Sequence, residues 1–385
     1  MGIPLSSPDI TAREIRAVKE VLKSPALCFG PRLEKFEKLG AAYAGRKYAV
    51  AVNSGTSGLH LIVRSLNLSR GDDVITTPYS FIASANCLLF EGVRPVFADI
   101  DEETLNLSPN MTESLLQKNK KVKAILPVDV FGHPADWDAF YDLSDRYKLK
   151  LIEDSCEAIG AEYVSPEGVK KKRWRKKKMA GSFGAASVFA FYPNKQITTG
   201  EGGLVLTDSK RIYMLCRSMR NQGRDGAGRI NGHLRLGYNY RLSDINCALG
   251  IVQLQRIGSI LNKRQRVAQC YNRHLETISG VEPLSALPNV KRSWFVYVVK
   301  LAKQFTRKDR DRIMRKLEAR GIACSTYFIP IHLQPYYRKT FGYKRGDFPV
   351  SESVSDRSIA LPFYSNLRKM DINYITDSIK KVLDG

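Results

Sequence analysis

The sequence predicts an α/β fold with two domains. A large domain with an N-terminal arm is expected over residues 1–250, on a mainly parallel mixed sheet, and a smaller α+β domain over residues 251–385. From Tyr48 onward, apolar segments of about four to eight residues alternate with segments of helical periodicity, which is typical of parallel strands covered by helices. After Asn239 the pattern changes to long helical segments, which indicates a second unit.

Length and composition agree with this fold class. The chain has 385 residues, enough for about two or three domains. It is 43% hydrophobic and 26% charged, which excludes a mainly disordered chain, and its ordinary glycine and proline content excludes a collagen-like one. The seven cysteines include no C-x-x-C pair, so we expect reduced, buried thiols. We expect a cytoplasmic protein, because no basic-then-apolar leader and no long uncharged apolar run occurs.

The expected elements can be assigned in chain order. The first helix is expected over Ser7–Leu22, where apolar residues recur at helical spacing after Pro8 and Asp9. The strands of the large domain are expected within 48–55, 73–79, 93–100, 123–132, 149–155, 186–193 and 202–207, with helices over 56–66, 80–92 and near 113–118. Long helices over 242–278, a strand over 293–302, a basic helix over 307–321 and a strand over 323–328 follow.

Polar residues gather after several predicted strands, where ligands bind in open α/β sheets. Asn53-Ser54-Gly55-Thr56-Ser57-Gly58 joins a strand to a helix, and free N–H groups with two hydroxyls there suit a phosphate. A simple Ser/Thr helix cap explains this segment equally well. Asp154 ends a buried strand, where a carboxylate is costly unless it is paired; it could equally cap the next helix.

Two further segments complete the constellation. Lys195 follows an apolar strand and precedes a loop rich in glycine and threonine; a lysine in a dry site can act as a nucleophilic amine. Residues 236–241, LGYNYR, enter the first long helix, although a plain turn before Ser243 explains them too. Phe81 offers an aromatic face after the strand at 73–79. Phosphate cradle, lysine, carboxylate and aromatic face together point to pyridoxal 5′-phosphate.

On these residues the sequence resembles the DegT/DnrJ/StrS family of pyridoxal-phosphate-dependent sugar aminotransferases. The resemblance covers nearly the whole chain and is most specific in PYSFIASAN, PVDVFGHPADWD, LIEDSCEAIGA, FAFYPNKQITTGEGG and GYNYRLSDINCALG. It implies an aspartate-aminotransferase-like fold, known as PLP fold type I. It also implies a homodimer whose active sites lie at the subunit interface.

The resemblance implies a role for each matching residue. Lys195 would form the Schiff base with the cofactor and act as the acid–base catalyst, and Asp154 would bind the pyridinium nitrogen. Phe81 would stack on the ring, Gly55 and Thr56 would hold the phosphate, and Asn239 would reach the phosphate from the other subunit. The candidate substrate-binding residues are Tyr192, Tyr327 and His332. No metal site is expected, because no two histidines have metal-ligand spacing.

Two positions differ from the commoner family pattern. Ala190 stands where many relatives have a serine that binds the phosphate, so one hydrogen bond to a charged group is missing or replaced. Glu157 stands where many relatives have glutamine or histidine beside the phenolic oxygen of the cofactor. A second carboxylate there is unfavourable unless it is protonated or paired. We interpret both differences as features of a subgroup.

The predicted activity is transfer of an amino group from L-glutamate or glutamine to a keto-sugar, most simply one linked to a nucleotide. The product would serve surface polysaccharide, lipopolysaccharide or antibiotic synthesis. Alternatives are a cyclitol (scyllo-inosose) aminotransferase and a non-catalytic cofactor-binding regulator. A dehydrase branch of the family carries histidine in place of the lysine, and Lys195 argues against that branch.

The chain is strongly basic, with 61 Lys and Arg against 38 Asp and Glu and a net charge of +23. Such a field helps to capture a nucleotide-diphosphate sugar. Residues 170–178 carry eight cations in nine residues, and we expect a solvated loop that makes at most weak contact with an anionic surface. No motif for sequence-specific binding of nucleic acid occurs.

Overall fold

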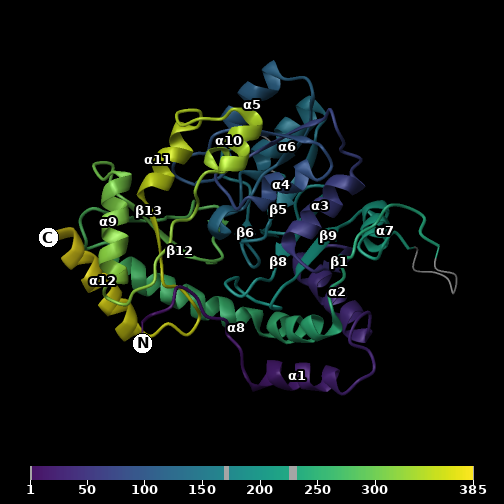
Figure 1. The fold of residues 1–385 in the computed structure, drawn as a ribbon, viewed down its shortest axis with the longest axis horizontal. Helices are drawn as coiled ribbons and strands as arrows, with labels where there is room; N and C mark the ends of the chain where they lie inside the picture. The colour runs from purple at the N-terminus through teal and green to yellow at the C-terminus, as the bar shows by residue number, and fades with distance from the viewer. Residues whose placement is uncertain (1, 169–172, 225–231, 385) are drawn as a thin grey trace.

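A computed structural model describes residues 2–168, 173–224 and 232–384 (Figure 1). Its centre is a seven-stranded sheet in the order β1-β9-β8-β5-β4-β2-β3. All neighbouring strands are parallel except β9, which is antiparallel to both β1 and β8. The predicted mainly parallel sheet is therefore confirmed. The strands are β1 (Tyr48–Val52), β2 (Asp73–Thr76), β3 (Arg94–Phe97), β4 (Val122–Leu126), β5 (Lys150–Asp154), β8 (Ala186–Ala190) and β9 (Gly203–Thr207).

Both faces of this sheet are buried, because helices cover each side. In β1, Val50 and Val52 belong to the same apolar core as Leu59 of α3, whereas Ala49 and Ala51 belong to the core that contains α2 and part of α8. Successive side chains of a strand point to opposite faces, so one short strand contributes to two cores. The helices around the sheet are α2 (Pro31–Ala44), α3 (Gly55–Ser65), α4 (Ala83–Leu89), α5 (Pro109–Lys118), α6 (Trp137–Tyr147) and α7 (Lys210–Met219).

The helix α2 was not among the predicted elements, although its ends carry clear sequence signals. Pro31 occupies its first position, where the missing N–H costs nothing. Gly45 ends it with a φ of +68°, a left-handed conformation that favours glycine. Its buried residues recur at helical spacing: Leu33, Phe36, Glu37, Gly40, Ala41 and Ala44.

The predicted long helices are a single helix, α8 (Asp244–Leu275), of 32 residues. Its first part packs in the core of the large sheet through Cys247 and Ile251, and its last part packs in a separate C-terminal core through Tyr271 and Leu275. Figure 1 shows α8 running from beside α2 to α12. The predicted boundary at residue 250 lies inside this helix, and the division into two domains stays a prediction.

The C-terminal part contains a three-stranded antiparallel sheet in the order β10-β12-β13. The strand predicted over 323–328 is wrong, because only Ser325 forms a bridge, to Ala360. Beyond it the chain turns toward the large sheet, where Tyr79 donates a hydrogen bond to the carbonyl of Tyr327 at 2.6 Å. The elements here are β10 (Val281–Pro283), β12 (Tyr297–Leu301), α9 (Arg307–Glu318), η2 (Ile331–Leu333), α10 (Pro335–Phe341), α11 (Pro349–Arg357), β13 (Ser358–Leu361) and α12 (Lys369–Asp384).

The first helix, α1 (Ala12–Leu22), begins later than predicted because Thr11 and Glu14 form a capping box at its start. Asp9, expected at the helix start, instead pairs with α8. Its carboxylate lies 2.7 Å from Arg256 and 2.8 Å from Lys263. The chain before it pairs with the C-terminal part, where Ile3 bridges Ile322.

All seven cysteines are free. The predicted burial of the thiols holds for Cys87, Cys216, Cys247 and Cys270, whereas Cys156 and Cys324 are half-buried and Cys28 is exposed. Within residues 2–168, 173–224 and 232–384, no helix combines the length and the apolar character needed to cross a bilayer.

Candidate active site

The N-terminus of α3 carries the residues that the sequence predicts to hold the phosphate. Ser54 caps the helix by accepting a hydrogen bond from the Ser57 N–H at 3.1 Å. Helix geometry leaves the N–H groups of Gly55 and Thr56 without intrahelical acceptors, so they remain for an anion. A Cβ at Gly55 would lie 2.8 Å from the Cβ of Ala190 and 2.9 Å from the Sγ of Cys156. Glycine is therefore required for the helix to begin this close to β8 and the loop after β5.

Asp154 ends β5, and the structure buries it with neutral hydrogen-bond donors. It is 4% exposed, and it accepts hydrogen bonds from the Ser84 hydroxyl at 2.7 Å and from the Cys156 N–H at 3.2 Å. A buried carboxylate is stabilised further by a cation. A protonated ring nitrogen is such a group, so this site fits the pyridinium end of the cofactor.

Lys195 lies just beyond β8, in contact with a carboxylate and an aromatic ring. Its Nζ is 3.7 Å from the Oε1 of Glu157 and 3.8 Å from the centroid of the Phe295 ring. The Lys195 side chain is only 12% exposed. The ring and the burial keep water away from the amine, and Glu157 supplies the opposite charge.

Glu157 is buried, and its neighbours show how a second carboxylate is accommodated in the site. Burial raises the pKa of Glu157, whereas Lys195 and the N–H of Phe131, which donates to Glu157 Oε2 at 2.9 Å, oppose that rise. The second carboxylate is therefore paired, as the sequence analysis required. The charges of Asp154 and Lys195 both influence the pKa of Glu157 and the pKa of the Cys156 thiol, so these four side chains lie near one another.

Two of the predicted substrate residues lie beside this group. Tyr327 is half-buried, and its hydroxyl accepts a hydrogen bond from Asn194, the residue before Lys195, at 3.3 Å. Tyr192 follows β8 and is 52% exposed. Phe81 is 59% exposed and precedes Ser84, the donor to Asp154, so its ring is free to stack on a ligand.

His332 is placed differently from the prediction. It is fully buried in η2, where its Nε2 lies 3.0 Å from the Oε1 of Glu352 and its ring packs against Phe348. Its other ring nitrogen, Nδ1, is buried without a hydrogen-bond partner in the part of the chain that the structure describes. The structure therefore encloses His332 in packing contacts, and its contact with substrate stays a prediction.

Asn239 is exposed and lies next to the loop before α3, because the side chain of Asn53 donates to its carbonyl at 3.4 Å. Its contact with the cofactor of another subunit stays a prediction.

Sequence reasoning missed Phe295 and Cys156 as members of the site. Phe295 lies 100 positions after Lys195 within an apolar run that reads as an ordinary strand. Cys156 lies two residues after Asp154 in the LIEDSCEAIGA segment, and this proximity in the sequence could have identified it as a site residue.

The structure describes residues 173–178 of the basic segment. Lys170, Lys171 and Lys172 lie outside the described residues. In the described remainder, Arg173 pairs with Asp145, and Lys177 lies 3.0 Å from Glu162. Its cationic residues are exposed, as expected, but the segment continues into β7 (Lys178–Met179), which pairs with β6 (Glu162–Tyr163) next to β11 (Val290–Lys291). Of the described residues of this segment only Lys178 belongs to a strand, and residues 173–177 form the exposed loop that the sequence predicts.

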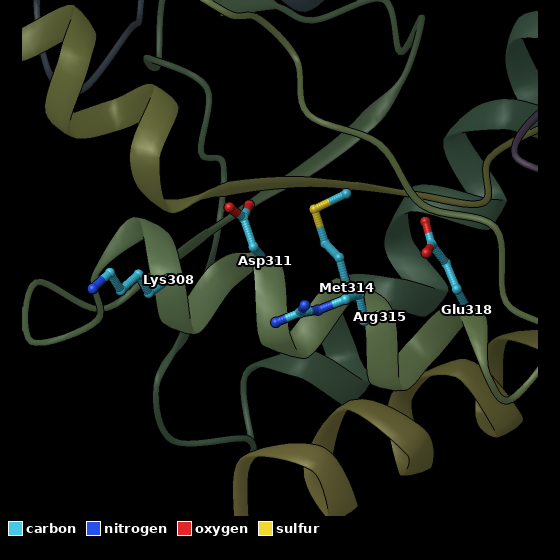
Figure 2. A pocket seen from close by; sticks show the side chains of 5 residues that line it. All are labelled: Lys308, Asp311, Met314, Arg315 and Glu318. Carbon is cyan, nitrogen blue, oxygen red and sulfur yellow. The ribbon is translucent and has the colours of Figure 1, made fainter.

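A separate surface cavity of about 470 Å³ lies on α9 (Figure 2). None of the residues of the candidate active site lines it. Its lining residues, all on α9, are Lys308, Asp311, Met314, Arg315 and Glu318.

Comparisons with known proteins identify the family of this chain. The model of the DegT/DnrJ/EryC1/StrS aminotransferase family matches residues 8–380. The chain is 33% identical over 393 residues to the spore coat polysaccharide biosynthesis protein SpsC of Bacillus subtilis, covering 100% of this chain and 97% of SpsC.

Two solved structures are similar over their full length. Helicobacter pylori PseC, an aminotransferase involved in the biosynthesis of pseudoaminic acid, superposes with a TM-score of 0.92 at 30% identity, covering 100% of both chains. DesV of S. venezuelae superposes with a TM-score of 0.89 at 29% identity, covering 99% of this chain and 98% of DesV. These similarities confirm the predicted family resemblance and the aspartate-aminotransferase-like fold.

Proposed function

Because the chain belongs to the DegT/DnrJ/EryC1/StrS aminotransferase family and is a pyridoxal-phosphate-dependent sugar aminotransferase, we propose that it transfers an amino group from L-glutamate or L-glutamine to a keto-sugar carried on a nucleotide. The amino sugar would enter surface polysaccharide, lipopolysaccharide or antibiotic synthesis. The observation that supports this most directly is the buried amine of Lys195, 3.7 Å from Glu157 in the space that Asp154 and the start of α3 also reach.

The described residues fit the cofactor at each of its ends. Gly55 and Thr56 would hold the phosphate through N–H groups of α3, and Asp154 would hold the ring nitrogen. Phe81 would cover one face of the ring, and Lys195 would bind the aldehyde carbon. When bound, pyridoxal phosphate supplies a ring that accepts electrons from the amino donor.

The residues of this chain then handle charge and protons. The Nζ of Lys195 takes the proton from the Cα of the amino donor and later returns a proton, as base and then acid. Asp154 keeps a proton on the ring nitrogen through its buried negative charge. Glu157 orients the amine of Lys195 from 3.7 Å, and the ring of Phe295 limits water around it.

Substrate recognition would use Tyr327 and Tyr192 beside Lys195. The side chain of Asn194 holds the hydroxyl of Tyr327, which fixes the direction of that phenol toward a sugar hydroxyl. The net charge of +23 attracts the phosphates of a nucleotide carrier. The roles of SpsC in polysaccharide biosynthesis and of PseC in pseudoaminic acid biosynthesis support a sugar acceptor. The free thiols support the proposed cytoplasmic location.

The decisive test is a screen of nucleotide-linked keto-sugars with purified holoenzyme and glutamate. We expect 2-oxoglutarate to form with at least one nucleotide sugar, and an amino sugar of matching mass to appear. The same sugar without its nucleotide serves as the control and should react more slowly. Amination of scyllo-inosose in place of every nucleotide sugar would redirect the proposal to a cyclitol substrate. No uptake of cofactor by the purified chain would contradict the enzyme assignment itself.

We also propose a homodimer with shared active sites, and mixed dimers test it. Asn239→Ala alone should weaken pyridoxal phosphate binding by about 10- to 150-fold, the worth of a hydrogen bond to a charged group. A dimer of one Lys195→Ala chain and one Asn239→Ala chain would then contain one intact site, with Lys195 from one chain and Asn239 from the other. We expect this mixed dimer to regain about half of the wild-type activity at limiting cofactor. If Asn239 serves its own chain, the mixture regains no intact site.

A further inference from the structure

Five side chains form a polar cluster between α3, the end of α4 and the segment before α8. It is called here the Glu91 cluster and consists of His60, Arg64, Glu91, Tyr238 and Tyr240. The Nε2 of His60 lies 2.7 Å from Glu91 Oε1, and the hydroxyl of Tyr238 donates to the same oxygen at 3.0 Å. Arg64 donates to Glu91 Oε2 at 2.6 Å. The Nδ1 of His60 lies 3.1 Å from the hydroxyl of Tyr240.

The charges in this cluster fix the direction of its hydrogen bonds. Burial lowers the pKa of His60, so its ring is neutral near pH 7. Burial raises the pKa of Glu91, but hydrogen bonds from His60, Tyr238 and Arg64 outweigh burial and lower it, so Glu91 is ionised. An ionised Glu91 only accepts, so His60 donates from Nε2 and accepts at Nδ1 from Tyr240. Both tyrosines are therefore tied to one buried carboxylate, directly or through His60.

The cluster determines which way Asn239 faces. The rings of Tyr238 and Tyr240 stack with centroids 4.9 Å apart and an angle of 12° between their planes, so both lie on one side of the segment. Asn239 sits between them in a bridge to Asn221, and side chains alternate along an extended chain. Its side chain is accordingly on the opposite side, where the residue is exposed.

The cluster also joins elements that carry the proposed site. His60 and Arg64 belong to α3, whose first residues form the phosphate cradle, and Glu91 closely follows α4. The carbonyl of Tyr240 accepts a hydrogen bond from the N–H of Asn53 at 3.0 Å, at the start of the same cradle. A shift of Tyr238 and Tyr240 would move Asn239 relative to that cradle.

Stability alone does not explain this cluster. The Glu91 side chain is only 11% exposed, whereas Arg64 is 30% exposed. Removing most of the water around the Glu91 carboxylate costs free energy, and apolar residues of similar size are often as stabilising. The cluster fixes the orientation of the Tyr238 and Tyr240 side chains, because hydrogen bonds depend far more on orientation than apolar contacts do.

We propose that Glu91 and His60 are positioning residues that hold Asn239 in the orientation needed to bind the phosphate of the cofactor in a second subunit. This inference rests on the proposed function. Neither residue touches the cofactor; each acts through Tyr238 or Tyr240.

The test compares two forms of the cofactor on apoprotein that carries Glu91→Gln. Pyridoxal phosphate reports the phosphate contact, and pyridoxal, which lacks the phosphate, reports only the remaining contacts. We expect Glu91→Gln to weaken pyridoxal phosphate binding by about tenfold, a part of the effect of Asn239→Ala, and to leave pyridoxal binding unchanged. The double variant with Asn239→Ala should bind no more weakly than Asn239→Ala alone, because both changes remove the same contact.

A matched control exists in the same chain. Glu352→Gln breaks another buried Glu–His pair, since Glu352 Oε1 lies 3.0 Å from His332 Nε2. It should lower thermal stability without changing the ratio of pyridoxal phosphate affinity to pyridoxal affinity. A purely structural role for Glu91 would give the same unchanged ratio.

The outcomes separate this inference from the proposed function. Unchanged pyridoxal phosphate binding in Glu91→Gln, an equal loss for both ligands, or additive effects in the double variant would each overturn the inference while the enzyme assignment stands. Failure of the wild-type chain to take up any pyridoxal phosphate would overturn both. If Glu91→Gln does not fold, Tyr238→Phe, which keeps the ring and removes only the hydroxyl, decides by the same ratio.

Discussion

Lys195→Ala is expected to abolish turnover, with kcat reduced by at least about 10⁴-fold, because the same nitrogen binds the cofactor aldehyde and moves the substrate proton. The variant should also lose the absorbance of cofactor bound through Lys195. Borohydride reduction followed by mass spectrometry of the peptide around position 195 measures this attachment independently of activity. Full activity in the variant would remove the basis of the proposed mechanism.

Two control variants show whether the loss of activity comes from the Lys195 amine itself, and not from its positive charge or from the loss of any lysine. Lys195→Arg keeps a cation beside Glu157 but cannot form the bond to the cofactor, so it should be as inactive as the alanine variant. Lys263→Ala removes a different lysine, one that lies 2.8 Å from Asp9 and is outside the site. It should retain activity and bound cofactor, with a change confined to stability.

Lys195→Ala is also expected to make the free energy of unfolding depend on pH. In the native protein, burial already raises the pKa of Glu157 above its ordinary value of 4.5, and Lys195 opposes that rise. Without Lys195 the folded-state pKa rises further, and a raised carboxyl pKa means that stability falls as pH increases from about 4.5 through the folded-state value. Lys195→Ala should therefore lose stability at neutral pH relative to acid pH. Adding Glu157→Gln should remove that slope in denaturant unfolding measured across pH.

Asp154→Asn is expected to lower kcat/KM by about 10³-fold or more, the scale of losing a preorganised charge at a reacting group. Asparagine has nearly the same volume, so the site keeps its shape. It carries no negative charge, and it cannot keep a proton on the ring nitrogen at neutral pH. Steady-state kinetics at saturating cofactor measure this effect separately from cofactor binding.

Two neighbours serve as controls for Asp154. Ser84→Ala removes only the donor at 2.7 Å, and we expect a loss of about tenfold, because the carboxylate remains. Glu153→Gln changes the adjacent residue of β5, whose carboxylate accepts hydrogen bonds from the N–H groups of Gly181 and Phe183. It should affect stability and leave kcat unchanged. Activity of Asp154→Asn within tenfold of wild type would contradict the assigned role.

Part of this molecule can be read from local sequence alone. The alternation of apolar and helical segments determined the mainly parallel sheet, because side-chain period and strand length are properties of neighbouring residues. The positions of Gly55, Asp154 and Lys195 at strand ends follow from the same local pattern, since parallel strands bring their carboxyl ends to one edge. The residue types at these strand ends, together with Phe81, therefore already indicated pyridoxal phosphate.

Contacts between distant segments were decided only by the tertiary structure. Phe295 falls within a predicted strand, yet it precedes β12, and its ring centroid lies 3.8 Å from the Nζ of Lys195. His332 was predicted to contact substrate, yet Glu352 and Phe348 enclose it. Tyr327 was predicted to lie in a strand, but its carbonyl instead accepts a hydrogen bond from the hydroxyl of Tyr79. Local periodicity indicates which residues prefer burial. The partner of each buried group depends on tertiary packing between segments that are distant in the sequence, and a short stretch of neighbouring residues holds no information about that packing.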